Sequence, residues 1–291
     1  MRTSHVSSLR FVLVVILALA LPLSALYAQE ATEDTDIGVK AVLEDGDVVS
    51  AVFEGGVGAH LYAFYGSEGD VFSLSMTQSE EGALDPFLVV LGPNGEVIAS
   101  DDDSGEDVLF SAAIDGVELP ADGVYFVLAT SFIAIDNILV EIGETGESAE
   151  EGESYELSIS GITAPAEDVD PEALLVNVSE IAVGDTLEAE SSAEFPVVYF
   201  VFNGAAGDVV TVTAESDDID TVLHVFAPSG DRIAINDDDD VEGGLNSAVR
   251  DVELPEDGPY LIFATDVFFY DLADEAEAAS YTGGVVTVSL Q

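Results

Sequence analysis

Hydrophobic and polar residues alternate with a period of two along several short segments of the chain. Residues 72–76 read FSLSM and residues 210–214 read VTVTA, so that every second side chain is apolar and the side chains between them are hydroxyls. This alternation predicts β-strands with one face in a core and the other toward water. No segment keeps a 3.6-residue period over several turns, so the pattern indicates an all-β protein.

A longer pattern occurs twice. Residues 85–103 read DPFLVVLGPNGEVIASDDD and residues 220–238 read DTVLHVFAPSGDRIAINDD. Each copy contains an apolar run, a Pro-x-Gly turn, a second short run and then a group of acids. This order predicts a β-hairpin that leads into an anionic loop.

The repetition extends over most of the chain. Gly-Asp pairs at 46–47 and 69–70 return 138 residues later, at 184–185 and 207–208, and VELPADGVY at 117–125 returns as VELPEDGPY at 252–260. Pro, Asp and Gly in the last motif form a tight turn that leads a Tyr into a strand. We therefore predict two tandem antiparallel β-sandwich modules, residues 37–162 and 176–291, with an acidic, Pro-containing linker at 163–175.

The N-terminal region differs from the repeats. Arg2 and Arg10 precede an apolar stretch, Phe11 to Leu26, which small residues follow up to Ala28. This arrangement predicts a secretory signal peptide at residues 1–28 and a secreted, extracellular protein, with the cell surface as a further location. A retained membrane anchor is the alternative, although the apolar run is short for a membrane span.

The charge of the chain excludes several kinds of partner. Five Lys and Arg residues face 59 Asp and Glu residues, which gives a net charge of −54, and there is no cysteine. We expect such a chain to be repelled by nucleic acid and, once the signal is removed, by anionic membranes. An exported protein without disulfides depends on packing or on bound ions for stability. An acidic surface adapted to a saline medium would explain the charge equally well.

The acids that flank each hairpin are candidate metal ligands. Two carboxylates about 4 Å apart repel by about 1 kcal/mol in water and about 4 kcal/mol at an effective dielectric constant near 20. Clustered carboxylates therefore recruit cations, and Ca²⁺ accepts several oxygen ligands in flexible geometry. The predicted calcium ligands are Asp85, Asp101, Asp102, Asp103, Asp220, Asn236, Asp237 and Asp238, beside Glu106, Asp107, Asp239, Asp240 and Glu242 in the same loops.

Two alternatives to this calcium hypothesis were weighed. An EF-hand loop does not fit, because the sixth and twelfth residues counted from Asp101 are Glu106 and Ala112 instead of Gly and Glu. The other alternative is a solvated acidic turn in which Asp side chains cap backbone amides. The sequence leaves the choice between calcium and a plain turn open.

Catalysis has little support in the sequence. The chain has no Cys, no His-Glu-x-x-His and no Gly-x-Ser-x-Gly motif. Beyond the signal, His60 and His224 occupy different positions in the two repeats, so we expect strand or loop residues and no enzyme. There is no Trp for a sugar platform, but Phe268 to Tyr270 form an aromatic run. This run predicts either a contact patch for another protein or a strand packed at a sandwich edge or between the modules.

The ordered motifs resemble the bacterial pre-peptidase C-terminal domain family. The motifs are Tyr-x-Phe, Gly-Asp, Asp-x-x-Leu, Pro-x-Gly, Asp-Asp and Leu-Pro-x-Asp-Gly-x-Tyr. In the first copy they are Tyr62/Phe64, Gly69/Asp70, Asp85/Leu88, Pro93/Gly95, Asp102/Asp103 and Leu119 to Tyr125. In the second copy they are Phe200/Phe202, Gly207/Asp208, Asp220/Leu223, Pro228/Gly230, Asp237/Asp238 and Leu254 to Tyr260. The second copy thus has Phe200 in place of Tyr62.

This resemblance implies a fold and a role. The family fold is a jelly-roll-like β-sandwich, so the expected class is all-β, with two tandem antiparallel jelly-roll-like domains. The related collagen-binding domains of bacterial collagenases imply calcium-dependent binding of protein fibres. We therefore expect a non-catalytic secreted binding or structural protein that contacts extracellular protein or cell-surface material. The alternative is an accessory or targeting subunit of an exported peptidase, acting in trans.

Overall fold

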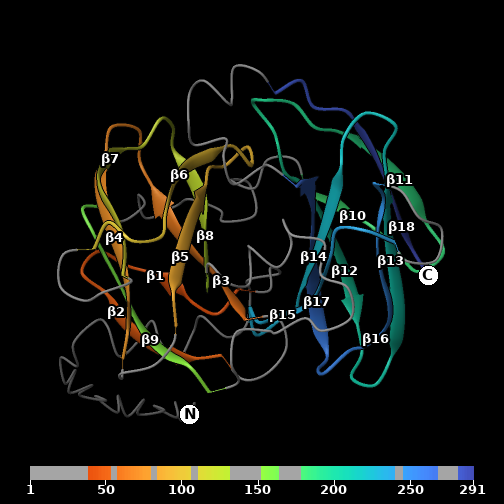
Figure 1. The fold of residues 1–291 in the computed structure, drawn as a ribbon, viewed down its shortest axis with the longest axis horizontal. Helices are drawn as coiled ribbons and strands as arrows, with labels where there is room; N and C mark the ends of the chain where they lie inside the picture. Colours follow the sequence, from red (N-terminus) through yellow and green to blue (C-terminus); the bar gives the residue numbers. More distant parts are fainter. Residues whose placement is uncertain are drawn as a thin grey trace, which may run out of the picture. The chain divides into compact units, whose positions relative to one another are not determined.

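The structure is a computed structural model that describes residues 39–53, 58–79, 84–105, 111–131, 152–163, 178–239, 245–267 and 281–291. In these ranges the chain forms 18 strands in four sheets and no helix (Figure 1), which confirms the predicted all-β class. Accordingly, none of the described segments is a helix that could span a membrane. The predicted signal peptide, residues 164–175 of the predicted linker and the aromatic run 268–270 lie outside these ranges.

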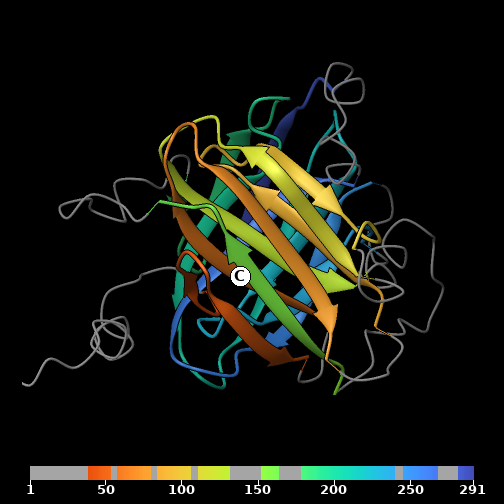
Figure 2. The same cartoon turned by 90° about the vertical axis from the view of Figure 1, so that its left-hand side faces the viewer.

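The first half of the chain forms two sheets. Their strand orders are β1-β3-β8-β5-β6 and β2-β9-β4-β7. Figure 2 turns this half toward the viewer, with its neighbouring strands side by side. The strands are β1 (Val42–Leu43), β2 (Val48–Val52), β3 (Ala59–Gly66), β4 (Val71–Gln78), β5 (Pro86–Leu91), β6 (Val97–Asp101), β7 (Ala112–Glu118), β8 (Gly123–Ser131) and β9 (Ser154–Ser160).

The second half repeats this topology strand for strand. Its sheet orders are β10-β12-β17-β14-β15 and β11-β18-β13-β16. The strands are β10 (Val178–Glu180), β11 (Thr186–Glu190), β12 (Val198–Gly204), β13 (Val209–Glu215), β14 (Thr221–Phe226), β15 (Arg232–Asn236), β16 (Ser247–Glu253), β17 (Gly258–Asp266) and β18 (Val285–Leu290). The duplication seen in the sequence is therefore a duplication of strand order.

One pairing in each half differs from the antiparallel prediction. β1 lies parallel to β3, and β10 lies parallel to β12. Between these partners the chain crosses to the other sheet through β2 or β11 and then returns. Such a crossover lets two strands of one sheet run in the same direction, whereas a tight hairpin cannot.

The alternating segments behave as predicted. Phe72, Leu74 and Met76 on β4 are at most 1% exposed and belong to the core between the first two sheets. The side chains of β13 at positions 210, 212 and 214 fill the same place in the second half. One face of each strand is thus in a core, which explains the period of two.

The continuous apolar runs have a different cause. All residues of β5, β8 and β14 are buried, so both faces of these strands are covered. Leu88 and Val90 on β5 join the core of the first half, while Phe87 and Val89 join a further cluster that includes Phe263 of the second half. A strand covered on both faces requires apolar residues at consecutive positions.

The Leu-Pro-x-Asp-Gly turn closes in the same way in both halves. The Tyr125 hydroxyl donates to Ala121 O at 2.7 Å, and the Tyr260 hydroxyl donates to Glu256 O at 2.7 Å. Each tyrosine enters a buried strand and bonds back to its own turn. This bond satisfies a buried hydroxyl and fixes the entry of the strand.

Candidate functional site

The predicted ligands of the first half gather at one end of the β5–β6 hairpin. Asp85 directly precedes β5, and Asp102 and Asp103 directly follow β6. Because the two strands are antiparallel, with Leu88 opposite Asp101, these positions share one corner of the sheet. Burial raises the pKa of the Asp85 carboxyl above its ordinary value, and the charges of Asp102 and Asp103 raise it further.

Asp101 has a different role from its neighbours. Its Oδ2 atom accepts hydrogen bonds from the backbone N–H groups of Ser104, at 3.1 Å, and Ala113, at 2.7 Å. The side chain therefore caps the turn after β6 and ties it to β7. This is the plain-turn alternative, and it holds for Asp101.

The second half builds an equivalent corner. Asp220 precedes β14, and Asp237 and Asp238 follow β15. Burial, followed by the charges of Asp238, Asp266 and Asp237, raises the pKa of Asp220 to about 6. Asn236 Oδ1 accepts from the Ala248 N–H at 2.8 Å, which is the role of Asp101 in the first half.

The two corners differ in one ion pair. Arg250 on β16 donates to Asp239 Oδ2 at 2.5 Å, and Asp239 is buried. The position equivalent to Arg250 in the first half holds Asp115. The second corner therefore carries a built-in cation where the first has another acid.

These corners do not form a complete calcium shell from the described side chains alone. Among those residues, no group of three or more His, Cys, Asp or Glu side chains is arranged to hold a metal ion. Asp101 and Asn236 are engaged by backbone amides, while Glu106, Asp107, Asp240 and Glu242 lie outside the described ranges. The calcium site remains a prediction.

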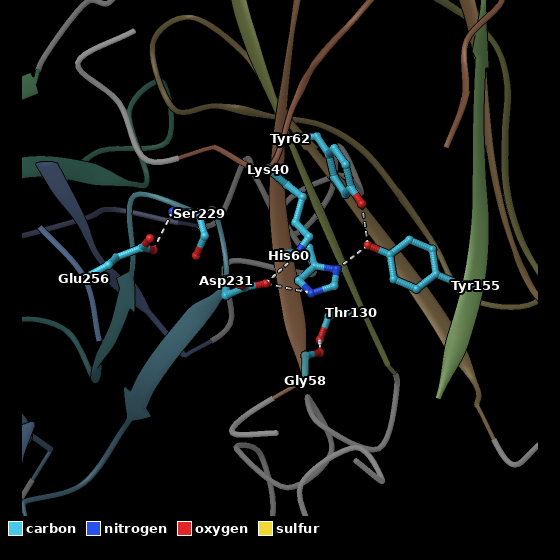
Figure 3. Close-up of polar contacts among 9 residues, drawn as sticks. All are labelled: Lys40, Gly58, His60, Tyr62, Thr130, Tyr155, Ser229, Asp231 and Glu256. Atoms are coloured by element: carbon cyan, nitrogen blue, oxygen red, sulfur yellow. Dashed lines mark hydrogen bonds and ion pairs between the residues drawn. The ribbon is translucent and has the colours of Figure 1, made fainter. Parts of the chain in front are cut away.

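A second polar cluster, absent from the sequence prediction, centres on His60 of β3 (Figure 3). His60 Nε2 lies 2.9 Å from Asp231 Oδ1, and His60 Nδ1 is hydrogen-bonded to the Tyr155 hydroxyl at 2.5 Å. The Tyr155 and Tyr62 hydroxyls share a hydrogen bond of 2.7 Å, and Lys40 Nζ donates to Asp231 Oδ1 at 2.6 Å. We call these five residues the His60 network.

Burial and charge set the protonation of this network. Burial opposes ionisation of Asp231, but hydrogen bonds from His60, Lys40 and Ser229 lower its pKa well below the ordinary value. Burial raises the pKa of Tyr62 to about 12 and that of Tyr155 well above its ordinary value. At neutral pH the network therefore holds one carboxylate and two neutral phenols.

The other histidine lies in a different setting. His224 on β14 is fully buried, and Arg232 Nη1 lies 3.2 Å from its Nδ1. Burial lowers the pKa of His224 well below its ordinary value, and the Arg232 charge lowers it further. His224 is therefore neutral and accepts from the guanidinium. Both histidines lie in strands, as the sequence predicted.

The sequence could not reveal the His60 network, because its members lie far apart in the chain. Tyr155 is 95 residues from His60, and Asp231 is 191 residues from Lys40. The one available signal was the replacement of Tyr62 by Phe200 in the second copy. A hydroxyl present in one repeat and missing from the other indicates a partner that only one repeat has.

Fold and site define a protein of duplicated β-sandwiches with matching acidic corners. No protein-family model and no curated protein matches the chain. A pre-peptidase C-terminal domain of a collagenase from Bacillus anthracis has a similar solved structure, with TM-score 0.31 and 14% identity over 39% of this chain and 94% of that one.

Two further solved structures are similar to the chain. PliG, a periplasmic inhibitor of g-type lysozyme from Aeromonas hydrophila, has TM-score 0.25 and 18% identity over 40% of this chain and 96% of that one. The CUB1-EGF-CUB2 domains of rat MASP-1 have TM-score 0.20 and 10% identity over 85% of this chain and 99% of that one. At these scores the likenesses assign no function to this chain.

Proposed function

We propose that this chain is an exported, non-catalytic binding or structural protein that presents two equivalent acidic corners to an extracellular partner. The observation that carries the proposal is the duplication of the corner. Asp85, Asp102 and Asp103 occupy the same ends of the same strands as Asp220, Asp237 and Asp238. Two equal sites on one chain let a repetitive partner be held with an avidity above that of one site.

The setting of the His60 network supports a non-catalytic role. Asp231, His60 and Tyr155 form an acid, imidazole and hydroxyl chain of the kind that activates nucleophiles. However, His60 is 2% exposed and Tyr155 is 0% exposed. A substrate cannot reach either group without opening the fold, and the raised pKa of Tyr155 makes its phenolate scarce.

Calcium is the cation that we propose for the corners. Carboxylates that raise the pKa of a neighbour repel one another, and a divalent cation relieves that repulsion. Asp85, Asp102 and Asp103 would supply oxygen ligands in the first half, and Asp220, Asp237 and Asp238 in the second. The resemblance of the motifs to pre-peptidase C-terminal domains and their collagen-binding relatives supports the same choice of ion and a fibrous or surface-bound protein as partner.

Calorimetric titration with CaCl₂ alone, against MgCl₂, tests the ion. We expect two calcium sites in the wild-type chain and one site in each paired variant, D85N/D102N and D220N/D237N. Magnesium should bind much more weakly, because it loses its water shell reluctantly. The calcium proposal fails if the wild-type chain gives neither heat nor a change of melting temperature with calcium.

Retention assays test the partner. Immobilised collagen and purified cell-wall material should each be offered to the wild-type chain and to the combined four-site variant, with and without a chelator. The proposal expects calcium-dependent retention on one of them that the four-site variant loses. If neither retains the chain and an exported peptidase co-purifies with it instead, the accessory role replaces the binding role.

A further inference from the structure

The two halves contact each other through equivalent turns. The Pro-x-Gly turn of the second half lies on β3, where Gly230 O accepts from the Leu61 N–H at 2.8 Å and a Cβ at Gly230 would overlap the Lys40 backbone. In the other direction, a Cβ at Gly95 would lie 2.7 Å from Val197 O and 3.2 Å from the Tyr199 hydroxyl. The repeats therefore meet as two subunits do across a two-fold axis.

A shared apolar cluster fills the rest of this surface. It includes Leu61, Val89 and Phe126 from the first five-stranded sheet, and Tyr199 and Phe263 from the second. The rings of Phe126 and Tyr199 lie 5.7 Å apart, and those of Tyr199 and Phe263 lie 4.8 Å apart. Apolar packing of this kind is non-directional, so by itself it would let either repeat dock on a copy of itself.

The His60 network breaks the two-fold resemblance. The strand registers identify the counterparts of its first-half members, for example Tyr155 opposite Ala51 on β2 and Val286 opposite Ala189 on β11. Each counterpart is apolar. For Lys40, His60, Tyr62 and Tyr155 they are, in order, Val178, Val198, Phe200 and Val286. All four polar groups are replaced together, which is typical of a hydrogen-bonded network that works as a unit.

The acidic member of the network also has a counterpart. Asp231 follows the glycine of its turn, and Glu96 follows the glycine of the equivalent turn. Glu96 Oε2 accepts from the Asn94 N–H at 2.9 Å, within its own turn. One carboxylate thus reaches across to the other half, while its counterpart bonds to its own loop.

We infer that this surface is a two-fold-type docking surface whose fitting partner is the opposite repeat, selected by the contact of Asp231 with Lys40 and His60. A second repeat docked on a copy of itself from another chain would place Asp231 against Val178 and Val198, buried without a cation. That arrangement is strongly disfavoured. Specificity arises here from a penalty on the wrong pairing as well as from the bonds in the right one.

A cleavable version of the full chain tests this inference. A protease site is introduced between residues 164 and 175, the purified chain is cut, and native mass spectrometry identifies the complexes that the two fragments form. The wild-type chain should give pairs of unlike fragments. Asp231→Asn should weaken that pairing at least tenfold and allow pairs of second-half fragments, because the amide removes the buried charge.

Glu96→Gln is the matched control, since it neutralises the counterpart carboxylate and should change the pairing less than threefold. The inference is wrong if wild-type fragments form like pairs as readily as unlike ones, if they separate, or if Glu96→Gln acts as strongly as Asp231→Asn. Sedimentation of the uncut chains is the second measurement. Concentration-dependent dimers are expected for Asp231→Asn alone, and equal behaviour of all three chains contradicts the inference.

Discussion

Single residues can be compared within this chain, because each has a counterpart in the other half. Gly116 on β7 and Asp251 on β16 are equivalent and both have positive φ angles, of 64° and 52°. They lie next to register shifts in the pairings of β4 with β7 and of β13 with β16. A bulge thus requires a left-handed residue at this point, and Asp251 adopts that conformation at some cost.

Substitutions at these two positions should change stability in opposite directions. Asp251→Gly should raise the free energy of unfolding by up to about 1 kcal/mol, because Gly adopts positive φ without strain. Gly116→Val should lower it by about 1–2 kcal/mol, the cost of a left-handed conformation for a residue with a Cβ. Urea unfolding measures both, and Gly116→Asp serves as the control, with a smaller loss than Val. Equal stability of all four chains would contradict the strain argument.

Asp220 should make stability depend on pH. Its pKa is about 6 in the folded chain and near the ordinary value of 3.8 when unfolded. Between these values the folded state binds more protons, so this group's contribution to stability falls as pH rises from about 4 to about 6. Asp220→Asn should flatten that part of the profile in urea unfolding with a chelator present. The exposed Asp217→Asn control should leave the slope unchanged.

At the scale of elements, one motif performs the same task in both halves. The hydroxyls of Tyr125 and Tyr260 close equivalent turns before the buried strands β8 and β17. Tyr125→Phe and Tyr260→Phe should each lower the free energy of unfolding by about 1 kcal/mol, because each leaves a carbonyl short of a hydrogen bond. Chemical unfolding of both variants and their double variant measures this. The losses should add, since the bonds lie in separate turns.

Elements were also the scale at which sequence was most informative. Alternation in 72–76 predicted the buried and exposed faces of β4 correctly, because strand periodicity is a local property. The parallel strand β1 was missed, since two residues carry no period. The site was only partly predictable. Sequence spacing brought Asp85 to the same hairpin as Asp102, but it could not show that the Asp101 side chain caps a backbone amide or that Asp231 reaches His60.

Across the whole molecule, positive charge is placed where it meets specific groups. Beyond the predicted signal peptide the Lys and Arg residues are Lys40, Arg232 and Arg250. Lys40 pairs with Asp231, Arg250 pairs with Asp239, and Arg232 contacts the buried His224. The few cations therefore serve particular contacts, and most of the 59 acids depend on solvent and ions.

This imbalance predicts that salt stabilises the fold. With a net charge of −54, like charges repel over the whole surface, and compaction brings them closer. Raising NaCl from 0.01 to 1 M shortens the screening length from about 30 Å to about 3 Å. We therefore expect the melting temperature to rise by several degrees over that range. The ion pair of Lys40 and Asp231 weakens under the same conditions, but it is a single contact against a general repulsion.

A charge variant separates this screening from the general effect of salt on apolar burial. Glu188 and Glu190 are exposed on β11, so their replacement by Gln removes two negative charges without touching a core. The variant should melt higher than the wild-type chain at 0.01 M NaCl and converge with it at 1 M. A difference that persists at high salt would point to strand propensity instead of repulsion. A melting temperature that falls with salt in both chains would show that specific ion pairs, and not net charge, dominate the stability of the molecule.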